Sequence, residues 1–401
     1  MRLTEQIQLK NTKQLSYLCH LTKNLYNLAN YYVRQEYFYL GNWLRYYDLW
    51  YMLKEKEPYK KLPSQTAQQT LKLVDKNWKS FFQSLKTLKK HPKNYLGPPK
   101  PPLYKKKDGE CIIVFTNQQC RIKRGFLYFP RKTQLPPVKT RIKSKLYHVR
   151  IIPKGLYYIL EIIYQMEVKN LNLDKERVIG IDLGLNNIIT MVNNAGLQPA
   201  IIKGGIIKSI NQFYNKQLAR YKGIKDKQRI GSDTKRMQWL TRTRNNKIND
   251  IFHKISRTVI NYCITHDFGT IVIGYNKTWK HKIKLGKRNN QNFVQIPFSK
   301  LVSQIKYKSE LIEIDVILEP ESFTSRCSFL DNESIEKHKK YQGKRICRGL
   351  YQSHRGAIIN ADVNGAYNIL KKAVPKAISA DGIEGVGLHP YSIAISSCNK
   401  I

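Results

Sequence analysis

The chain is poor in acidic residues. It contains 28 Asp and Glu residues against 71 Lys and Arg, which leaves a formal net charge of +43 over 401 residues. A folded chain with so much charge of one sign repels itself unless a polyanion neutralises it. The composition therefore predicts nucleic acid as the binding partner, with an affinity that falls steeply as salt is added.

Long apolar runs are also missing. The sequence has no stretch of 18 or more apolar residues and no signal-peptide pattern, so it predicts no membrane-spanning helix. Its basic residues are spread along the whole length and are not concentrated on one amphipathic helix, which makes a membrane surface a poorer partner than nucleic acid.

Cysteine is scarce as well. Seven cysteines, an odd number, are scattered through the chain without regular spacing. This pattern excludes a disulfide framework and is typical of a protein in a reducing, cytoplasmic compartment, where we expect it to associate with the nucleoid.

Residues 1–170 predict an N-terminal lobe of mixed strands and helices with a basic surface. Residues Arg2–Lys10 alternate as in a strand, and apolar residues recur every three or four positions from Leu18 to Tyr32, as in a helix. A second helix opens at Ser64, and short strand-like runs fill residues 112–164.

Two segments of this lobe allow more than one interpretation. The aromatic run between Tyr37 and Tyr51 favours a helix core, but its rings could also stack on bases. The Pro-rich basic segment 91–107 must be extended, either tracking phosphates or serving as a solvated linker.

Residues 175–375 predict an α/β domain of the RNase H-like (RuvC-type) plan with helical insertions. A continuous apolar strand ends at Asp182, and two further strands follow in a meander. Helices and strands then alternate up to a last helix at 362–372. The predicted elements after the first strand are strands 188–192 and 200–202, helices 207–222 and 233–266, strand 270–273, helix 299–311 and strand 313–318. We expect residues 376–401 to form a C-terminal tail.

Asp182 is the first candidate site residue. It ends a buried strand in Gly180-Ile181-Asp182-Leu183-Gly184, where a carboxylate is costly to leave unpaired and a cation is a natural partner. The small Gly184 would let a ligand approach the backbone. Actin-like ATPases place an Asp and a Gly similarly to hold nucleotide phosphate and magnesium, and Asp182 could also be a simple turn residue.

Asp362 is the second candidate. It opens the last helix in Asn360-Ala361-Asp362-Val363-Asn364, and Asn368 follows. A helix-capping Asp is one interpretation, and a second magnesium ligand beside Asp182 is the other. Two metal ions held by acidic side chains would support phosphodiester hydrolysis, which fits the basic charge better than an ATPase does.

Three motifs together resemble a known family. Asp182 in Gly-Ile-Asp-Leu-Gly, then Thr324–Ser328 (Thr-Ser-Arg-Cys-Ser), then Asp362–Ile369 follow one another in the order and spacing of the TnpB (OrfB) family. They also resemble the RuvC-type domain of compact type V CRISPR effectors. The resemblance implies a transposon-encoded, magnesium-dependent endonuclease, with a guide RNA and a target DNA as partners. A nuclease-inactive, RNA-guided DNA-binding regulator is the alternative.

The chain departs from the family at its third carboxylate. The family usually has a Glu after the strand that here ends in Gly274. The next strand ends with Glu319 and Glu321, and neighbouring strands lie about 5 Å apart, so a Glu there could reach the same metals. We select Glu321 over Glu319, which precedes a proline. The expected catalytic and magnesium-binding set is thus Asp182, Glu321 and Asp362.

The second departure concerns zinc. The family has two Cys-x-x-Cys pairs in this region, whereas residues 324–358 contain only Cys327 and Cys347, with His338 and His354 poorly spaced. Tetrahedral zinc needs four ligands, so we expect a metal-free remnant of a zinc ribbon. Its basic residues either touch nucleic acid or are merely solvated. They are Lys337, Lys339, Lys340, Lys344, Arg345 and Arg348.

Overall fold

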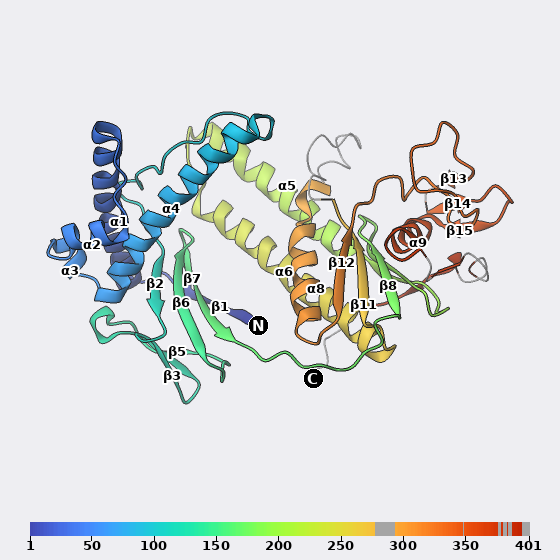
Figure 1. The fold of residues 1–401 in the computed structure, drawn as a ribbon, viewed down its shortest axis with the longest axis horizontal. Helices are drawn as coiled ribbons and strands as arrows, with labels where there is room; N and C mark the ends of the chain where they lie inside the picture. The colour runs from blue at the N-terminus through green and yellow to red at the C-terminus, as the bar shows by residue number, and fades with distance from the viewer. Residues whose placement is uncertain (277–292, 348, 376–377, 380–382, 384–386, 395–401) are drawn as a thin grey trace. The chain divides into compact units, whose positions relative to one another are not determined.

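The computed structural model shows a mixed α/β protein made of two compact units (Figure 1). It describes residues 1–276, 293–347, 349–375, 378–379, 383, 387, 388–394. The first unit comprises Met1–Met166 and the second Glu167–Ile401. Each unit contains both β-sheets and helices.

The first unit is built on a four-stranded antiparallel sheet. Its strands follow the order β1 (Arg2–Lys10), β7 (Tyr157–Gln165), β6 (Leu146–Pro153), β2 (Ile113–Thr116). Exposure alternates along β1, as its sequence predicts for a strand with one face against a core. A smaller sheet joins β3 (Arg121–Lys123), β4 (Phe126–Tyr128) and β5 (Val138–Lys139).

Four helices complete this unit. They are α1 (Lys13–Leu40), α2 (Tyr46–Leu53), α3 (Glu57–Lys60) and α4 (Ser64–Lys90). The core prediction for the aromatic run holds for only half of its rings. Tyr37, Trp43, Tyr46 and Trp50 pack against the helical core. In contrast, Phe38, Tyr39, Tyr47 and Tyr51 are exposed. The division follows the two faces of the helices, because packed and exposed rings occur in both α1 and α2.

The Pro-rich segment 91–107 is anchored to α1 through its backbone, while residues 103–107 stay exposed. Its first half contains a short 3-10 helix, η1 (Pro92–Asn94), so the expectation of an extended chain is wrong there. Asn27 donates its side-chain amide to the Lys105 carbonyl (2.9 Å) and accepts from the Lys105 amide (2.8 Å). Asn30 and Arg34 both donate to the carbonyl of Pro102. A segment rich in proline has few amides of its own, and its carbonyls are satisfied here by helix side chains.

The second unit is built on a six-stranded mixed sheet. Strands β8, β9 and β10 form the predicted antiparallel meander, while β11 and β12 run parallel to β8. The order is β12 (Asp315–Glu319), β11 (Thr270–Gly274), β8 (Val178–Asp182), β9 (Asn187–Asn193), β10 (Ala200–Lys203), β16 (Tyr391–Ser392). Because β16 pairs with β10, part of the expected C-terminal tail is in fact a strand of this sheet.

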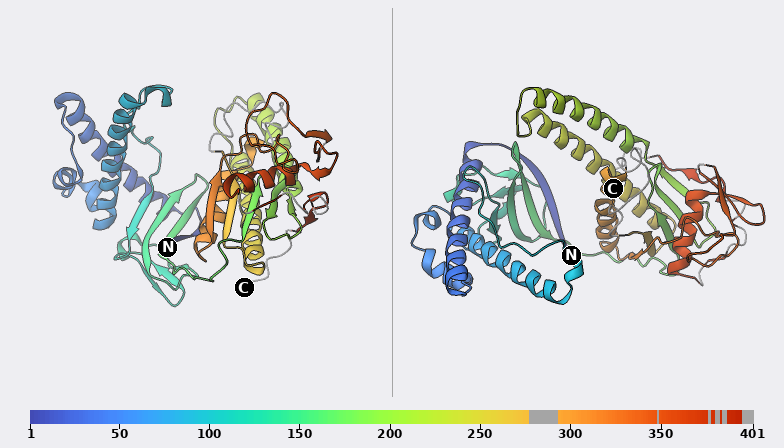
Figure 2. Two further views of the ribbon diagram at one scale, coloured as in Figure 1. Left: turned by 45° about the vertical axis from the view of Figure 1, so that its right-hand side comes forward. Right: turned by 90° about the horizontal axis from the view of Figure 1, so that it is seen from above.

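Helices cover both faces of this sheet. On one face lie α5 (Gly205–Lys227), α6 (Lys235–Thr265) and α8 (Phe298–Glu310), and α5 and α6 form a long antiparallel pair (Figure 2). On the other face lies α9 (Ala361–Ala373), which packs against β8, β9 and β11. Strands buried on both faces must be apolar throughout, which explains the unbroken apolar sequence of β8.

Gly180 allows the close packing of α9 on β8. A Cβ at this position would lie 2.8 Å from the Leu370 Cβ and 3.0 Å from the Ala366 carbonyl oxygen. We expect Gly180→Ala to lower the free energy of unfolding by about 1–3 kcal/mol through overpacking, measured by chemical denaturation. Gly205→Ala is the control, since a Cβ there meets nothing within 4 Å. Equal stabilities of the two variants would contradict this account of the packing.

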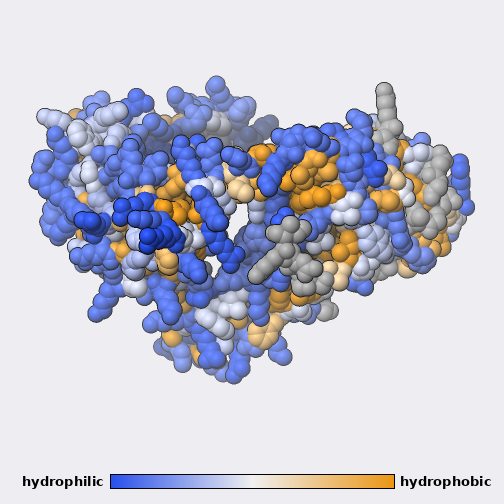
Figure 3. All heavy atoms as spheres, turned by 90° about the horizontal axis from the view of Figure 1, so that it is seen from below, coloured by the Kyte–Doolittle hydropathy of each residue, from blue (hydrophilic) through white to orange (hydrophobic). Residues whose placement is uncertain are grey.

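A small sheet leads into α9. Strands β13 (Lys344–Cys347), β14 (Leu350–Gln352) and β15 (Ile358–Asn360) form an antiparallel ribbon, and α9 follows β15 directly. In the described part of the chain, no helix has the length and apolar character to span a membrane. Hydrophilic side chains dominate the face shown in Figure 3, as the charge composition predicts.

Candidate functional site

The carboxyl ends of β8, β11 and β12 meet at one edge of the large sheet. Ile181 pairs with Ile273, which places Asp182 beside Gly274, and Gly274 pairs in turn with Glu319. In open α/β sheets ligands bind at this edge. Asp182, the last residue of β8, therefore stands where a functional carboxylate is expected.

The first turn of α9 brings Asp362 to the same edge. The helix is capped by Asn360, whose side-chain oxygen accepts hydrogen bonds from the amides of Asp362 and Val363. The capping interpretation of Asp362 is therefore wrong, and its carboxylate has other partners. Asn187 donates its side-chain amide to Asp362 Oδ2 at 2.8 Å, and the Arg345 guanidinium lies 3.9 Å from Asp362 Oδ1.

The two aspartates interact electrostatically. Burial and, second, the nearby Asp362 charge raise the pKa of Asp182 to about 7, while the Leu183 amide and Arg345 act in the opposite direction. A half-buried carboxylate beside another disfavours its own charged form. A bound cation would relieve both causes, so this pair has the electrostatic character of a cation site.

A glycine lies beside the Asp182 carboxylate. A Cβ on Gly365 of α9 would lie 3.6 Å from Asp182 Oδ2, so the glycine leaves space beside the carboxylate. Gly184 has a different role from the expected one. A Cβ there would lie 2.6 Å from the Asn187 carbonyl oxygen, so the tight turn between β8 and β9 itself requires glycine.

Glu321 lies over Gly274. A Cβ built on Gly274 would lie 2.6 Å from Glu321 Oε1 and 2.8 Å from Glu321 Cγ. The Glu321 side chain therefore fills the space in which a side chain of residue 274 would begin. Glu319 is engaged elsewhere, because its carboxylate forms an ion pair with Lys372 at 3.1 Å.

The three candidate carboxylates at this edge are not grouped around a single point. Among the residues that the structure describes, no three His, Cys, Asp or Glu side chains are grouped closely enough to bind one ion as they stand. The carboxylates of Asp182 and Asp362 are neighbours, and Glu321 comes from the adjoining strand end. Oxygen ligands of this kind suit magnesium, and binding of one ion by all three would require Glu321 to lie closer to the pair than it does here.

The asparagines of α9 serve a different purpose. Asn364 donates to the Cys327 carbonyl and accepts from the Phe329 amide, and Asn368 donates to the carbonyls of Thr324 and Cys327. Both amides are fully buried. The polarity of this helix, which suggested metal chemistry in the sequence, is thus explained by anchoring of the 324–329 turn.

The two cysteines of the candidate zinc-ribbon remnant lie in different environments. Cys327 is buried, with its sulfur 3.7 Å from the Glu336 carbonyl oxygen, whereas Cys347 lies exposed at the end of β13. The His338 ring contacts the Ser334 carbonyl oxygen at 2.8 Å, and the backbone amide of His354 donates to Asp331. Cys327 and His338 therefore have local partners within the remnant.

Five of the six candidate basic residues of this region are exposed. They are Lys337, Lys339, Lys340, Lys344 and Arg345. Arg348 lies outside the described residues. Arg345 also approaches Asp362, a proximity that its place in a charged run did not reveal. Asn187 is a second site residue that sequence reasoning missed, since an Asn after a turn carries no distinctive signal.

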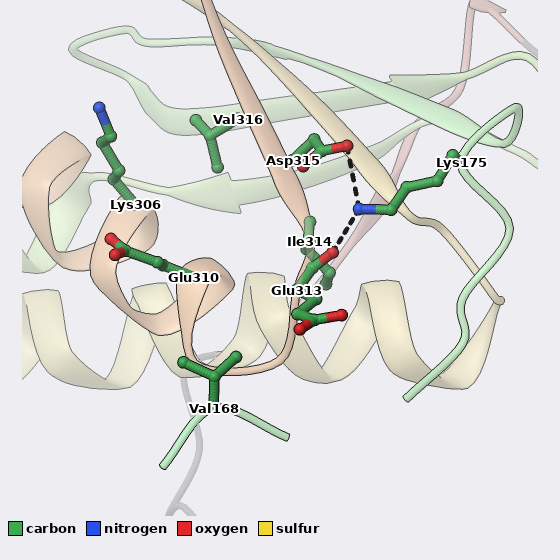
Figure 4. Close-up of a pocket in the computed structure, with 8 residues that line it drawn as sticks. All are labelled: Val168, Lys175, Lys306, Glu310, Glu313, Ile314, Asp315 and Val316. Atoms are coloured by element: carbon green, nitrogen blue, oxygen red, sulfur yellow. Dashed lines mark hydrogen bonds and ion pairs between the residues drawn. The ribbon is translucent and has the colours of Figure 1, made fainter. Parts of the chain in front are cut away.

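A pocket of about 510 Å³ lies at the opposite edge of the sheet (Figure 4). It is lined by the start of β12, where Lys175 bridges the Asp315 carboxylate (2.9 Å) and the Glu313 carbonyl. Glu310 and Lys306 of α8 add one charge of each sign. In all, two lysines and three carboxylates line the pocket, which is distant in the fold from the strand ends that carry Asp182 and Gly274.

Comparison with known proteins gives two family matches. Residues 161–280 match the OrfB family model described as a probable transposase, and residues 298–369 match the Cas12f1-like TNB domain. The TnpB-like protein ORF457 of Acidianus two-tailed virus is 24% identical, with 90% of this chain and 84% of the relative covered.

Solved structures with a similar chain course include two effector proteins. A Cas12f1–sgRNA–target DNA complex has a TM-score of 0.48 at 11% identity, covering 92% of this chain and 98% of the other. The mini-RNA-guided endonuclease CRISPR-Cas phi3 has a TM-score of 0.45 at 10% identity, covering 95% and 93%. These TM-scores are too low for the structural similarity to support a conclusion about function. By its sequence matches and its ordered motifs, the chain is similar to the TnpB (OrfB) family over most of its length.

Proposed function

We propose that this protein is an RNA-guided DNA endonuclease whose C-terminal domain has the RNase H-like (RuvC-type) plan. In this proposal residues 1–170 form the nucleic-acid-binding lobe, and residues 175–375 form the nuclease domain, with 324–358 as a degenerate zinc-ribbon insertion. A meander of β8, β9 and β10, followed by parallel β11 and β12, supports the plan. The similarity to the TnpB (OrfB) family supports the guided mode of action.

One observation carries the catalytic part of the proposal. Asp182 and Asp362 lie close enough for the charge of one to raise the pKa of the other, and Glu321 fills the space over Gly274 on the adjacent strand. Three carboxylates from distant parts of the chain thus share one sheet edge. That edge is where the family's missing glutamate would lie, so Glu321 is the replacement that we propose.

Each residue at this sheet edge would have its own role in the proposed reaction. Asp182, Glu321 and Asp362 would hold magnesium, which when bound stabilises the charge that develops on the phosphate and activates water. Asn187 orients the Asp362 carboxylate through its hydrogen bond. Arg345, exposed beside Asp362, would contact a phosphate of the substrate, because a guanidinium binds phosphate oxygens with two N–H groups.

The exposed lysines of the 324–358 segment would add non-specific affinity. Lys337, Lys339, Lys340 and Lys344 point into solvent on a segment joined to α9, and each phosphate contact adds to the salt dependence of binding. Guide RNA and target DNA are the polyanions that the similarity to this family supports as partners, and neutralisation of the +43 charge requires partners of that kind.

A cleavage assay tests the proposal. The protein is purified with its copurifying RNA, and that RNA is sequenced to design a matching DNA duplex. We expect cleavage in magnesium, none in EDTA, and loss of about 100-fold or more in rate for Asp362→Asn at unchanged duplex binding. Binding without cleavage by the wild-type protein would favour the nuclease-inactive regulator. Absence of bound RNA at low salt would contradict the guided mode.

A further inference from the structure

The C-terminal half of α1 and the helix α2 present an exposed aromatic surface. Tyr39 is 79% exposed, Tyr47 is 77% exposed, Tyr51 is 73% exposed and Phe38 is 53% exposed. The opposite face of α2 buries Leu49 and Leu53 in the helical core. Large exposed rings on a rigid, well-packed helix mark a contact surface for a partner.

The spacing of two rings on α2 fits a nucleobase. Tyr47 and Tyr51 are four residues apart, so they share one face of the helix, with an axial rise of about 6 Å between them. Stacked bases repeat every 3.4 Å or so, and two rings that sandwich one base must lie roughly 7 Å apart. Small changes in side-chain torsion would therefore admit one base between the two tyrosines.

The cations around this surface support an anionic, aromatic partner. The Lys54 amine lies 5.2 Å from the ring centre of Tyr51 and 4.9 Å from that of Trp50, and the Arg34 guanidinium lies 5.1 Å from that of Phe38. The nearby acids are already engaged. Asp48 accepts the Arg45 amide at 2.8 Å, and Glu55 pairs with Lys60 at 2.7 Å.

We propose that Tyr47 and Tyr51 form a stacking platform for unpaired nucleotides of a bound nucleic acid strand. Stacking on aromatic rings accepts any base, because every base has a π-face. A second copy of this chain is a poorer occupant, since it carries the same charge of +43. Strand binding at this surface does not depend on the proposed metal site, so a protein that fails to cleave DNA could still bind strands here.

Fluorescence anisotropy with the full-length protein tests the platform. The probes are a labelled single-stranded RNA of about 12 nucleotides and a duplex of the same length. We expect Tyr47→Ala with Tyr51→Ala to weaken single-strand binding by about 10-fold or more and to leave duplex binding unchanged. The dependence on salt should keep its slope, since no positive charge is removed. The double Phe variant should retain binding, because it keeps the rings.

Tyr17→Ala is the matched control, as Tyr17 is a 50% exposed tyrosine near the start of α1. The platform is rejected if the double Ala variant binds the single strand as tightly as this control, or if it loses duplex affinity equally. It is also rejected if sedimentation shows that the double variant converts a dimer to a monomer while strand binding is unchanged. That result would make the surface an interface between copies.

Discussion

Glu321→Ala is expected to reduce DNA cleavage by about 100-fold or more, and moving the carboxylate to position 274 is expected to restore part of it. The Glu321 side chain fills the space above Gly274, where a Cβ would meet Glu321 Oε1 at 2.6 Å. In the Gly274→Glu, Glu321→Ala double variant that space is open. The other close atom, Ile369 Cδ1 at 2.5 Å, ends a flexible side chain and can move.

The single Gly274→Glu variant is the control for this exchange. With Glu321 still in place, two carboxylates and their side chains compete for one space, so we expect lower stability than wild type and low cleavage. Cleavage rate and duplex affinity are measured for all three variants. If Glu321→Ala cleaves at the wild-type rate, Glu321 is not a metal ligand. If the double variant is folded and binds DNA but stays inactive, the two positions are not equivalent.

Asp182→Asn is expected to abolish cleavage and yet to stabilise the metal-free protein at pH 8. Burial and Asp362 raise the pKa of Asp182 to about 7. A carboxyl group whose pKa is higher in the folded state favours folding while it is protonated, and this contribution is lost as the pH rises through 7. At pH 8 the charged Asp182 therefore costs stability that a neutral Asn does not.

The expected gain is on the order of 1–2 kcal/mol, since the carboxylate is only half-buried, and it corresponds to a rise in Tm of roughly 3–6 °C. Thermal unfolding in EDTA measures it, at pH 8 and at pH 5, where the difference should shrink because wild-type Asp182 is protonated. Magnesium should raise the Tm of wild type more than that of the variant. Equal Tm values at pH 8 would contradict the electrostatic strain between Asp182 and Asp362.

Several features of the candidate site were readable in the sequence. An Asp that ends an unbroken apolar strand is uncommon without a partner, and this singled out Asp182. The ordered motifs around Asp182, Thr324 and Asp362 pointed to the family, which the matches support. The sheet meander followed from runs of apolar residues, since strands buried on both faces have that pattern.

Other features depended on contacts between distant segments. Glu319 forms an ion pair with Lys372, whereas Glu321 fills the space over Gly274. These two contacts favour Glu321 as the candidate ligand. The amides of Asn364 and Asn368 resemble site residues in the sequence, but they anchor a turn about 40 residues earlier. Likewise, the aromatic run is divided between core and surface by the helix face that each ring occupies.

By itself, the sequence determined the charge, the strand and helix periodicity, and the two aspartates at element ends, because these depend on residue type and on local spacing. Only the tertiary structure decided which side chains meet at the sheet edge, which acids are already paired, and which tyrosines remain exposed. Those outcomes depend on distances between residues far apart in the chain, and such distances are set by packing rather than by local sequence.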